Sequence, residues 1–552
     1  INNIDVQNTA QIVDNDGTEG EEDELTGSIS ASDLNVNAET TGLINTVSVA
    51  GGVTSSGTDS EEGFLDKVKA PYNKMTEISK SALGGINNIS NKLQNVIKTM
   101  DLNAGAGNGG TTGITSDDAG TPSFSFAGAG SVSLNMVSDT TKAVVDGANI
   151  TLNNDGALQV GARDSAFTGA WSGAAGLSFR KEQQSQKSTS VAVSGAVGVN
   201  DIDNEITALV KDSNVIGAKD VDVAAVSGGT TVAAGLGATL TKDGGQGENY
   251  SGGGSVSVNL LDKNVNANME NVGLTGDIQD KADIDVAAYE SDVQVTGGVN
   301  ANIALGGGSL VGGGVTVANI KNNINAGITG GTYTNVDDVN VKGLLAVTQV
   351  TAALSAGIAA GGSGTNNAFG GAVIYNGLSN DITAGIDGAA ITADGLVNVM
   401  AKDTESSSDD AKPYQNLLGD YKEHNQFAAD NGIDTTGSSY YTDLDTADEK
   451  VDYDGSKGST IVGAAAVVTA GSNSNAGGAA VNIANIDNDF TAKINNATIT
   501  AENVRAEADA DTLIVNASGG VAAGTKSFGG MGSVTWQAID NDLSAEIENS
   551  II

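Results

Sequence analysis

A degenerate repeat of roughly sixty residues runs almost from one end of the chain to the other. Its first anchor is predicted to be an Ile-Asp-Asn-like turn followed by a strand with alanine at a fixed place, as in NDIDNEITALV at 200–210 and NGLSNDITAGI at 376–386. The marker alanines are Ala10, Ala143, Ala208, Ala267, Ala326, Ala384, Ala492 and Ala545. Such fixed-period similarity predicts an array in which each unit buries its apolar side against its neighbours.

A short β-branched strand forms the second anchor. It occurs as LNVNA at 34–38, LQVGA at 158–162, VDVAA at 221–225, IDVAA at 284–288, VNVKG at 339–343, VNVMA at 397–401 and NVRAE at 503–507. The spacings between Val160, Val223, Val286, Val341 and Val399 are 63, 63, 55 and 58 residues. Because side chains alternate across a strand, this pattern predicts that the valines point inward and that the Asp or Asn between them points outward.

These patterns predict an all-β chain folded as a right-handed parallel β-helix, the hand following from the usual crossover preference. Each repeat is expected to hold three strand–turn cycles, or roughly twenty residues per coil. On that basis the array would contain roughly twenty-two coils and form a rod about 100 Å long. Asn and Gly are expected at the coil corners, since both tolerate left-handed backbone.

The composition supports an array rather than an ordinary globular core. The chain has 552 residues with 76 Gly, 4% aromatic residues and no Cys. An acidic, Gly-rich chain is also typical of disorder, but the strict apolar alternation in VAVSGAVGVN at 191–200 argues against it. A long array gains stability from stacking and needs no disulfides.

The net charge of -42 limits the partners. It excludes nucleic acid, because few cations are present to neutralise phosphates, and it disfavours anionic lipid. No apolar run is long enough for a membrane helix. The chain starts inside one anchor and stops soon after another, so we expect a segment of a longer protein.

Two insertions interrupt the repeats. We expect β-helix repeats at 1–53, 122–403 and 459–552, a helical insertion at 54–121 and an acidic, loop-rich insertion at 404–458. Apolar residues at helical spacing over 64–78 and 86–100, separated by Gly84 and Gly85, predict a helical hairpin in the first insertion. The second contains His424, Tyr440 and Tyr441. Insertions in arrays commonly carry binding surfaces.

Calcium is the metal ion that the acidic loops bring into consideration. Oxygen-rich loops with glycine at a sharp bend suit a hard cation. The candidate stretches are Asp14, Asp16, Gly17, Thr18, Glu19, Glu21, Glu22, Asp23 and Glu24, and Asp452, Tyr453, Asp454 and Gly455. Neither completes a helix–loop–helix calcium pattern, and a solvated acidic loop is the competing interpretation. No metal-binding or cofactor-binding residue is therefore assigned.

Catalysis by paired carboxylates is the main alternative to a binding role, because parallel β-helices also carry polysaccharide lyases and glycosidases. Most acids here recur at equivalent places, as do Asp203, Asp262, Asp487 and Asp540, and are expected to cap coil corners. An active site should occur once, so no catalytic residue is assigned and the chain is expected not to be an enzyme. A self-assembling surface filament or surface-layer unit is a third possibility, because the ends of a β-helix are exposed strand edges.

The segment VAVSGAVGVNDIDNEITALV at 191–210, repeated with the short VDVAA strands, resembles the passenger repeats of large Gram-negative surface proteins. The most similar family is that of the leukotoxin-type filamentous adhesins, which are exported by type V pathways like autotransporter passengers. The resemblance covers most of the chain outside 54–121 and 404–458. It implies secretion or display at the bacterial cell surface, a β-helical stalk, and attachment to host or neighbouring cells through a surface receptor or glycan.

Overall fold

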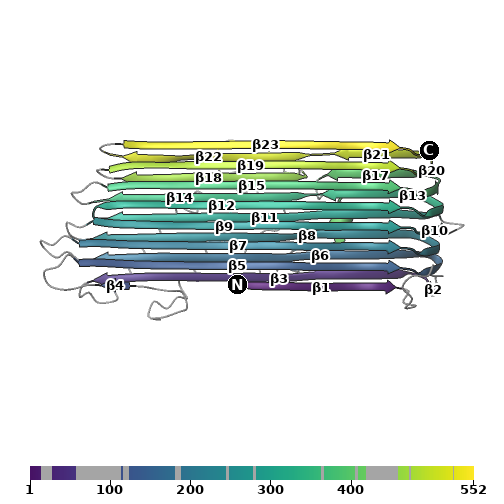
Figure 1. Cartoon of the computed structure of the whole chain (residues 1–552), viewed down its shortest axis with the longest axis horizontal. Coiled ribbons are helices and arrows are strands. Elements are labelled where there is room, and N and C mark those ends of the chain that lie inside the picture. The colour runs from purple at the N-terminus through teal and green to yellow at the C-terminus, as the bar shows by residue number, and fades with distance from the viewer. Residues whose placement is uncertain are drawn as a thin grey trace.

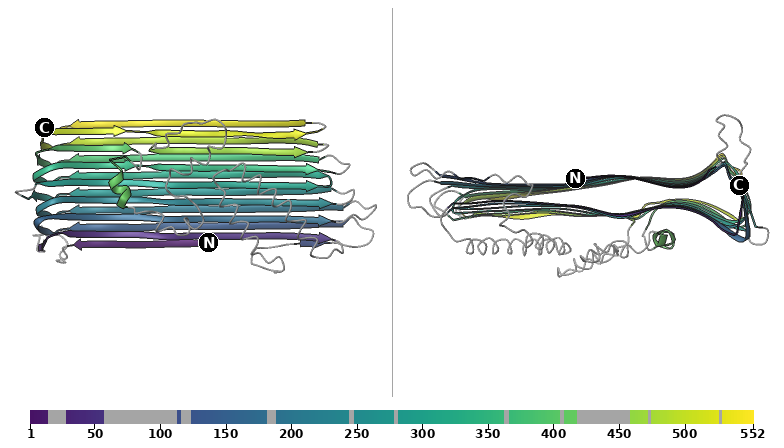
Figure 2. Two further views of the ribbon diagram at one scale, coloured as in Figure 1. Left: turned by 180° about the vertical axis from the view of Figure 1, so that it is seen from behind. Right: turned by 90° about the horizontal axis from the view of Figure 1, so that it is seen from below.

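The computed structural model describes residues 1–13, 28–56, 113–115, 123–180, 188–243, 248–277, 281–361, 366–404, 408–417, 458–471, 474–525 and 528–552. Almost all of these residues lie in strands of two long, flat sheets, A and B, that face each other (Figures 1 and 2). With one short exception the strands pair in parallel, so the predicted all-β, parallel architecture is confirmed.

Sheet A carries one long strand from each coil. In spatial order its strands are β1 (Asn2–Val13), β5 (Ser123–Asp146), β7 (Ser188–Lys211), β9 (Glu248–Glu270), β12 (Gly308–Thr329), β15 (Asn366–Asp387), β19 (Ser474–Asn495) and β23 (Phe528–Glu548). The short β4 (Gly113–Thr115) pairs antiparallel with β5.

Sheet B carries the return path of each coil. Its longest strands are β3 (Leu34–Ser56), β6 (Asn149–Arg180), β8 (Asn214–Asp243) and β11 (Ala282–Leu305). Later coils divide this path into β13 (Thr332–Leu345) and β14 (Val347–Ala360), then β17 (Leu396–Asp403) and β18 (Ser459–Gly471), then β21 (Asn503–Asp509) and β22 (Thr512–Gly524). Short strands at the corner complete it, namely β2 (Ser28–Ala31), β10 (Gly273–Gly276), β16 (Ala390–Ala393) and β20 (Thr498–Thr500).

The register confirms that the anchors stack. All eight marker alanines pair in one column, from Ala10 with Ala143 to Ala492 with Ala545. The second anchor stacks from Val36 to Val399, and the last coil places Ala506 rather than Val504 at that point. Since Val36 pairs directly with Val160, no coil separates β3 from β6.

The predicted coil size is wrong. Each repeat of roughly sixty residues forms one coil, so sheet A contains eight stacked strands instead of the twenty-two coils expected. At about 4.8 Å per strand the stack is only about 34 Å tall, whereas a strand of 24 residues such as β7 is about 80 Å long. Glycine and Asn-Asp pairs inside the runs suggested turns, but the chain passes through them fully extended.

The corners that follow the sheet A strands from β5 to β23 contain left-handed residues, as predicted. Positive φ angles occur at Gly147, Asp212, Asn271, Gly330, Gly388, Asn496 and Asn549. The backbone amides of all but Asn549, which lies in the last coil, continue the inter-coil hydrogen bonding, as where Asn271 N donates to Thr329 O at 2.8 Å. The turn therefore costs no backbone hydrogen bond. Beyond it the short strands close a triangular cross-section at one end of the molecule (Figure 2, right).

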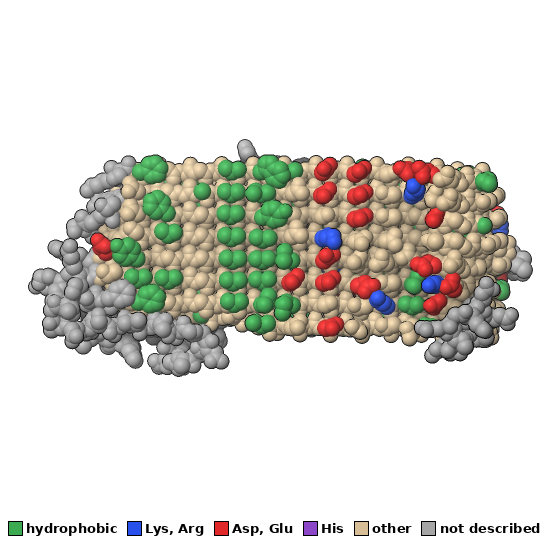
Figure 3. All heavy atoms as spheres, viewed as in Figure 1, with side chains coloured by type: hydrophobic (Ala, Val, Ile, Leu, Met, Phe, Trp, Pro, Cys, Tyr) green, Lys and Arg blue, Asp and Glu red, His purple; other side chains and the backbone are tan. Residues whose placement is uncertain are grey.

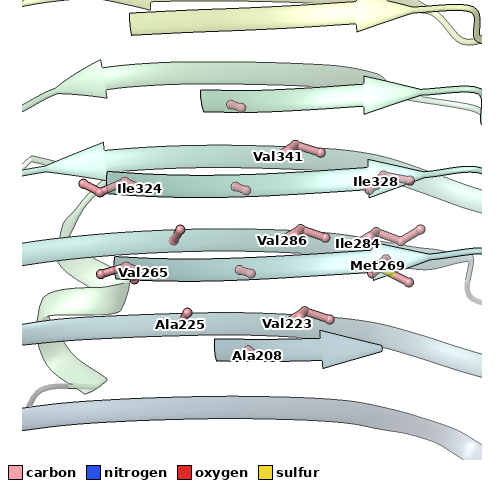
Figure 4. Packing of buried hydrophobic residues seen from close by; sticks show 14 of the residues in the cluster. Ala208, Val223, Ala225, Val265, Met269, Ile284, Val286, Ile324, Ile328 and Val341 are labelled. Atoms are coloured by element: carbon pink, nitrogen blue, oxygen red, sulfur yellow. The ribbon is translucent and has the colours of Figure 1, made fainter. Parts of the chain in front are cut away.

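Apolar side chains fill this triangular end. Figure 4 shows Val223, Val286 and Val341 at one place in successive sheet B strands, and Met269 and Ile328 at one place in sheet A. All five are fully buried. Asp222, between Val221 and Val223, points outward as predicted from the alternation. Burial of these columns in every inner coil is the main apolar stabilisation of the stack.

The middle of the interior is polar. Asn135, Asn200 and Asn259 form a buried ladder in which each amide donates to the next side-chain oxygen at 2.8 and 2.7 Å. A second buried ladder joins Asn322, Asn380 and Asn488 at 2.8 and 2.7 Å. Stacked amides of this kind satisfy each other, so burial leaves most of their polar groups paired.

Small residues line the remaining, flat half of the interior. A Cβ atom added at Gly237 would lie 2.7 Å from Gly254 O in the opposite sheet, and one at Gly176 would lie 2.7 Å from Val193 O. The sheets approach so closely here that glycine is required at these positions. Gly237 and Gly176 therefore allow the two sheets to pack closely and do not form turns.

Both predicted insertions are only partly described. The predicted helices at 64–78 and 86–100 lie outside the described residues. Within the second insertion, the chain leaves sheet B between β17 and β18, in the middle of a coil, and α3 (Lys412–Leu417) is the one helix among the described residues.

Candidate functional site

The outward face of sheet A carries two adjacent columns of apolar side chains (Figure 3). Parallel, in-register strands place equivalent residues directly above one another. The first column, called here the valine ridge, consists of Val132, Val197, Val256, Val315, Val373, Val481 and Val534. The second consists of Leu134, Val199, Val258, Val317, Tyr375, Ile483 and Trp536. Val132 is 56% exposed and Tyr375 41%, so the columns face solvent.

A furrow runs beside the valine ridge. Two residues earlier in each strand stand Gly130, Gly195, Gly254, Gly313, Gly371, Ala479 and Gly532. A Cβ atom added at Gly195 or Gly371 would meet no other atom within 4 Å. On the far side of this glycine furrow, Val193, Val311 and Phe369 are exposed. The result is an uncharged surface with a ridge and a groove, both parallel to the stack.

Acidic side chains form two further columns on the same face (Figure 3). The first contains Asp203, Asp262, Asp487 and Asp540, and the second contains Glu205, Asp381, Asp489 and Asp542. The first four were expected at coil corners, and that prediction is wrong. They lie inside the long strands and point outward, because the Ile-Asp-Asn anchor is strand rather than turn.

A buried charge interrupts the second asparagine ladder. Lys263 occupies the place of Asn204 and Asn322 in the neighbouring strands. Its Nζ lies 3.4 Å from Asp292 Oδ2 across the interior, and the two side chains are 5% and 2% exposed. Lys263 Nζ also donates to Ser227 Oγ at 3.5 Å. The ammonium group therefore ties the two sheets together.

Two more carboxyl groups surround this pair. Burial raises the pKa of Glu290 well above its usual value, and the neighbouring Asp292 raises it further. Burial likewise raises the pKa of Asp164 to about 6, although Lys263 opposes the shift. Burial alone would lower the pKa of Lys263. The negative charges of Asp292, Glu290 and Asp164 outweigh this effect, so the pKa of Lys263 is raised. The cluster is closed to solvent, so it contributes to the interior rather than to a ligand site.

A separate cluster of polar side chains lies where α3 covers the outside of sheet B. Tyr414 Oη donates to Asp285 Oδ2 at 2.8 Å, and Lys342 Nζ lies 3.3 Å from the same oxygen. The ring centroids of Tyr414 and Tyr289 are 6.2 Å apart, and Lys342 Nζ lies 5.6 Å from the centroid of the Tyr414 ring. Burial, followed by the charge of Asp285, raises the pKa of Tyr414, so its hydroxyl remains a proton donor.

The residues considered for calcium lie outside the described parts of the chain. This applies to the acidic stretch from Asp14 to Glu24 and to Asp452, Tyr453, Asp454 and Gly455, as it does to His424. Among the residues that are described, no group of three or more His, Cys, Asp or Glu side chains could hold a metal ion. The described helix is also too short to cross a membrane.

The outward face of sheet A was not predicted from the sequence, although the signal was present. The valine column repeats in VSLN at 132–135, VGVN at 197–200 and VSVN at 256–259, and aligning the repeats on the marker alanine would have revealed it. In comparisons with known proteins, no protein family, curated protein or solved structure matches the chain. The exposed apolar face is therefore the candidate functional site on physical grounds, since patches of this extent commonly mark interaction surfaces.

Proposed function

We propose that this chain is a segment of a filamentous adhesin displayed at a bacterial cell surface or secreted by a type V pathway. In this proposal the coils form a right-handed parallel β-helix that serves as the stalk. The insertions supply contact surfaces for a receptor or glycan on host or neighbouring cells.

The observation that carries the proposal is the unbroken register of the stack. The marker alanines align through all eight sheet A strands, so the molecule is a linear array that can be lengthened by adding coils. A linear array suits a protein that holds a binding surface at a distance from its anchor. The net charge of -42 supports exposure to solvent rather than contact with nucleic acid.

The second insertion supports the idea that binding elements are mounted on the stalk. It leaves the middle of sheet B, and α3 lies against the outside of that sheet, with Tyr414 fixed by Asp285. An element attached in this way can vary in sequence without disturbing the stacked strands.

The acidic columns favour binding over catalysis. The aspartates of the first column recur in several coils, whereas the two acids of a glycosidase act as one unique pair. A repeated surface can engage a repetitive ligand, such as a glycan, at several points and gain affinity through multivalency.

Adhesion can be tested with beads that carry the purified chain. We expect coated beads to attach to bacterial or epithelial cells, and free protein to compete for attachment. A variant in which 405–457 is replaced by a short Gly-Ser linker should keep its far-UV circular dichroism and attach less. The matched control replaces the tip of a short loop, 244–247, with a linker of equal length.

Attachment no stronger than that of beads coated with an equally acidic, unrelated protein would contradict the adhesin proposal. If a purified polysaccharide were instead cleaved by the chain, the carbohydrate-active alternative would take its place.

A further inference from the structure

We propose that two copies of this chain pair face to face through the outward surface of sheet A, each inserting its valine ridge into the glycine furrow of the other. This inference goes beyond the adhesin proposal and does not depend on it. The proposed contact joins the outward faces of two sheets A and does not involve the exposed strand edges at the ends of the stack.

The surface has the shape that self-pairing requires. The valine ridge and the glycine furrow are two residues apart in each of the seven strands from β5 to β23, and both columns run continuously through these strands. Consider a twofold axis parallel to the stack and midway between them. Rotation about this axis places the ridge of one copy over the furrow of the other, which is the self-complementarity that an isologous interface needs.

The columns farther from this axis also match. Phe369 and Val311, on the far side of the furrow, would face the Tyr375 and Val317 column of the partner. The next column outward, with Phe126 and Tyr250, would face the column that contains Met136 and Leu260. At these places apolar side chains therefore meet apolar side chains. Asp201, which would face the partner's Val191, is the one side chain in these six columns that is charged at neutral pH.

The charge distribution favours a twofold axis parallel to the stack over a twofold axis along the strands. The first acidic column begins seven residues from the proposed axis, at Asp203 and Asp262. At about 3.3 Å per residue, the acidic columns of the two copies would lie on opposite sides and about 45 Å apart, several Debye lengths at physiological salt. A twofold axis along the strands would instead place acidic column over acidic column, at a large electrostatic cost.

The area is sufficient for a stable dimer. Six columns span ten residues, about 33 Å, and seven strands span about 29 Å, so each copy would bury about 1,000 Å². The total of about 2,000 Å² lies at the upper end of the range for stable complexes. The flatness of sheet A lets all seven strands make contact at once (Figure 2, right).

Sedimentation velocity on the purified chain tests the pairing. We expect a species of 109.8 kDa, twice the chain mass of 54.9 kDa, at micromolar concentration. Because each copy carries a charge of -42, raising NaCl from low concentration to about 0.5 M should strengthen pairing by screening repulsion. Association through bound cationic impurities would weaken under the same change.

Two substitutions on the ridge form the critical variant. Val315→Lys with Val373→Lys adds charge at exposed positions, so the fold should survive, as far-UV circular dichroism would show. Dimer affinity should fall about 100-fold or more, because the lysines would lie buried in the partner's furrow. The matched control, Asp203→Lys with Asp381→Lys on the acidic columns, should leave the dimer intact.

The chain contains no cysteine, which permits a direct test of the axis. A variant with Gly313→Cys and Val315→Cys should be joined into covalent dimers by a short thiol crosslinker, whereas Asp262→Cys should not. The proposal would be overturned if the chain remained monomeric up to about 100 μM, a concentration well above the usual dissociation constants of interfaces with this buried area. So would a dimer that survives the ridge substitutions, or efficient crosslinking through Asp262→Cys.

Discussion

Gly176 in β6 illustrates why glycine is so frequent in this chain. A Cβ atom there would lie 2.7 Å from the carbonyl oxygen of Val193 in the facing sheet, too close for any backbone to accept without moving. We therefore expect Gly176→Ala to lower the free energy of unfolding by about 1–3 kcal/mol, as overpacking does. Urea denaturation would measure this loss. Gly195→Ala, whose methyl group meets nothing within 4 Å, should change stability by less than about 0.5 kcal/mol. Equal midpoints for the two variants would contradict close packing of the sheets.

Asp164 should make stability depend on pH. Burial raises the pKa of its carboxyl group from 3.8 to about 6, so the folded state binds more protons than the unfolded state between these values. The contribution of Asp164 to stability is therefore greatest below pH 3.8 and falls as the pH rises through about 6. Asp164→Asn, which keeps an oxygen to accept from Asn204 Nδ2, should remove this dependence.

Thermal unfolding of wild type and Asp164→Asn at several pH values would measure the effect. We expect the variant to be more stable than wild type at pH 7, by on the order of 1–3 kcal/mol, and this advantage to vanish near pH 4. Asp203→Asn, on the exposed column, is the control and should behave like wild type. A variant advantage that is constant with pH would show that the Asp164 carboxyl group does not titrate as described.

The sequence predicted the direction of individual side chains better than their chemistry. Alternation was sufficient to place Val221 and Val223 inside and Asp222 outside. The buried Lys263 was not predicted, because a lone lysine in a polar stretch is indistinguishable from a surface residue. Its partner Asp292 is distant in sequence and approaches only because the two sheets face each other.

At the scale of elements, Tyr414 is the main side chain through which α3 attaches to sheet B, beside a hydrogen bond that Arg163 of β6 donates to Leu417 O. Tyr414 donates to Asp285 and packs on Tyr289, whereas Lys412 in the same helix is exposed. Tyr414→Ala should detach the helix without unfolding the stack, because sheet B is stabilised by its own ladder. Hydrogen exchange over 408–417 should become at least about tenfold faster, with little change in the melting temperature. Lys412→Ala should leave exchange unchanged. Equal protection in both variants would mean that Tyr414 does not hold the helix.

Strand length is the element property that the sequence did not predict. Glycine and Asn-Asp pairs within VAVSGAVGVNDIDNEITALV are common turn signals, and they suggested several short strands. In β7 they form one strand of 24 residues instead. The signals misled because Gly198 lies where the two sheets touch and Asn200 belongs to an interior ladder, two demands that arise only after the coils stack. Where turns do occur, as at Asn271, the prediction of left-handed corners is confirmed.

For the whole molecule, the unit of folding follows from the register: one repeat is one coil. Asn259 pairs with Ala318 in the next strand of sheet A, so these residues occupy equivalent places in successive coils. Deleting 260–318 would join Asn259 to Asn319 and remove one complete coil, including Lys263 and Asp292 together. The remaining coils should stack in register, because the buried ion pair of Lys263 and Asp292 is removed as a unit and a linear array tolerates the loss of an internal unit.

We expect this shortened chain to fold with an unchanged β signal per residue in far-UV circular dichroism. Its stack, measured by small-angle X-ray scattering, should be shorter by one strand spacing of about 4.8 Å. Deleting only 260–279, a length that coils of twenty residues would tolerate, should instead put the strands out of register and expose apolar side chains. It should give an aggregating or unfolded product, because a register shift moves buried columns to the surface. If the shorter deletion folded and the full-coil deletion did not, the coil would be the smaller unit, and the face through which two copies are proposed to pair would not exist as a continuous surface.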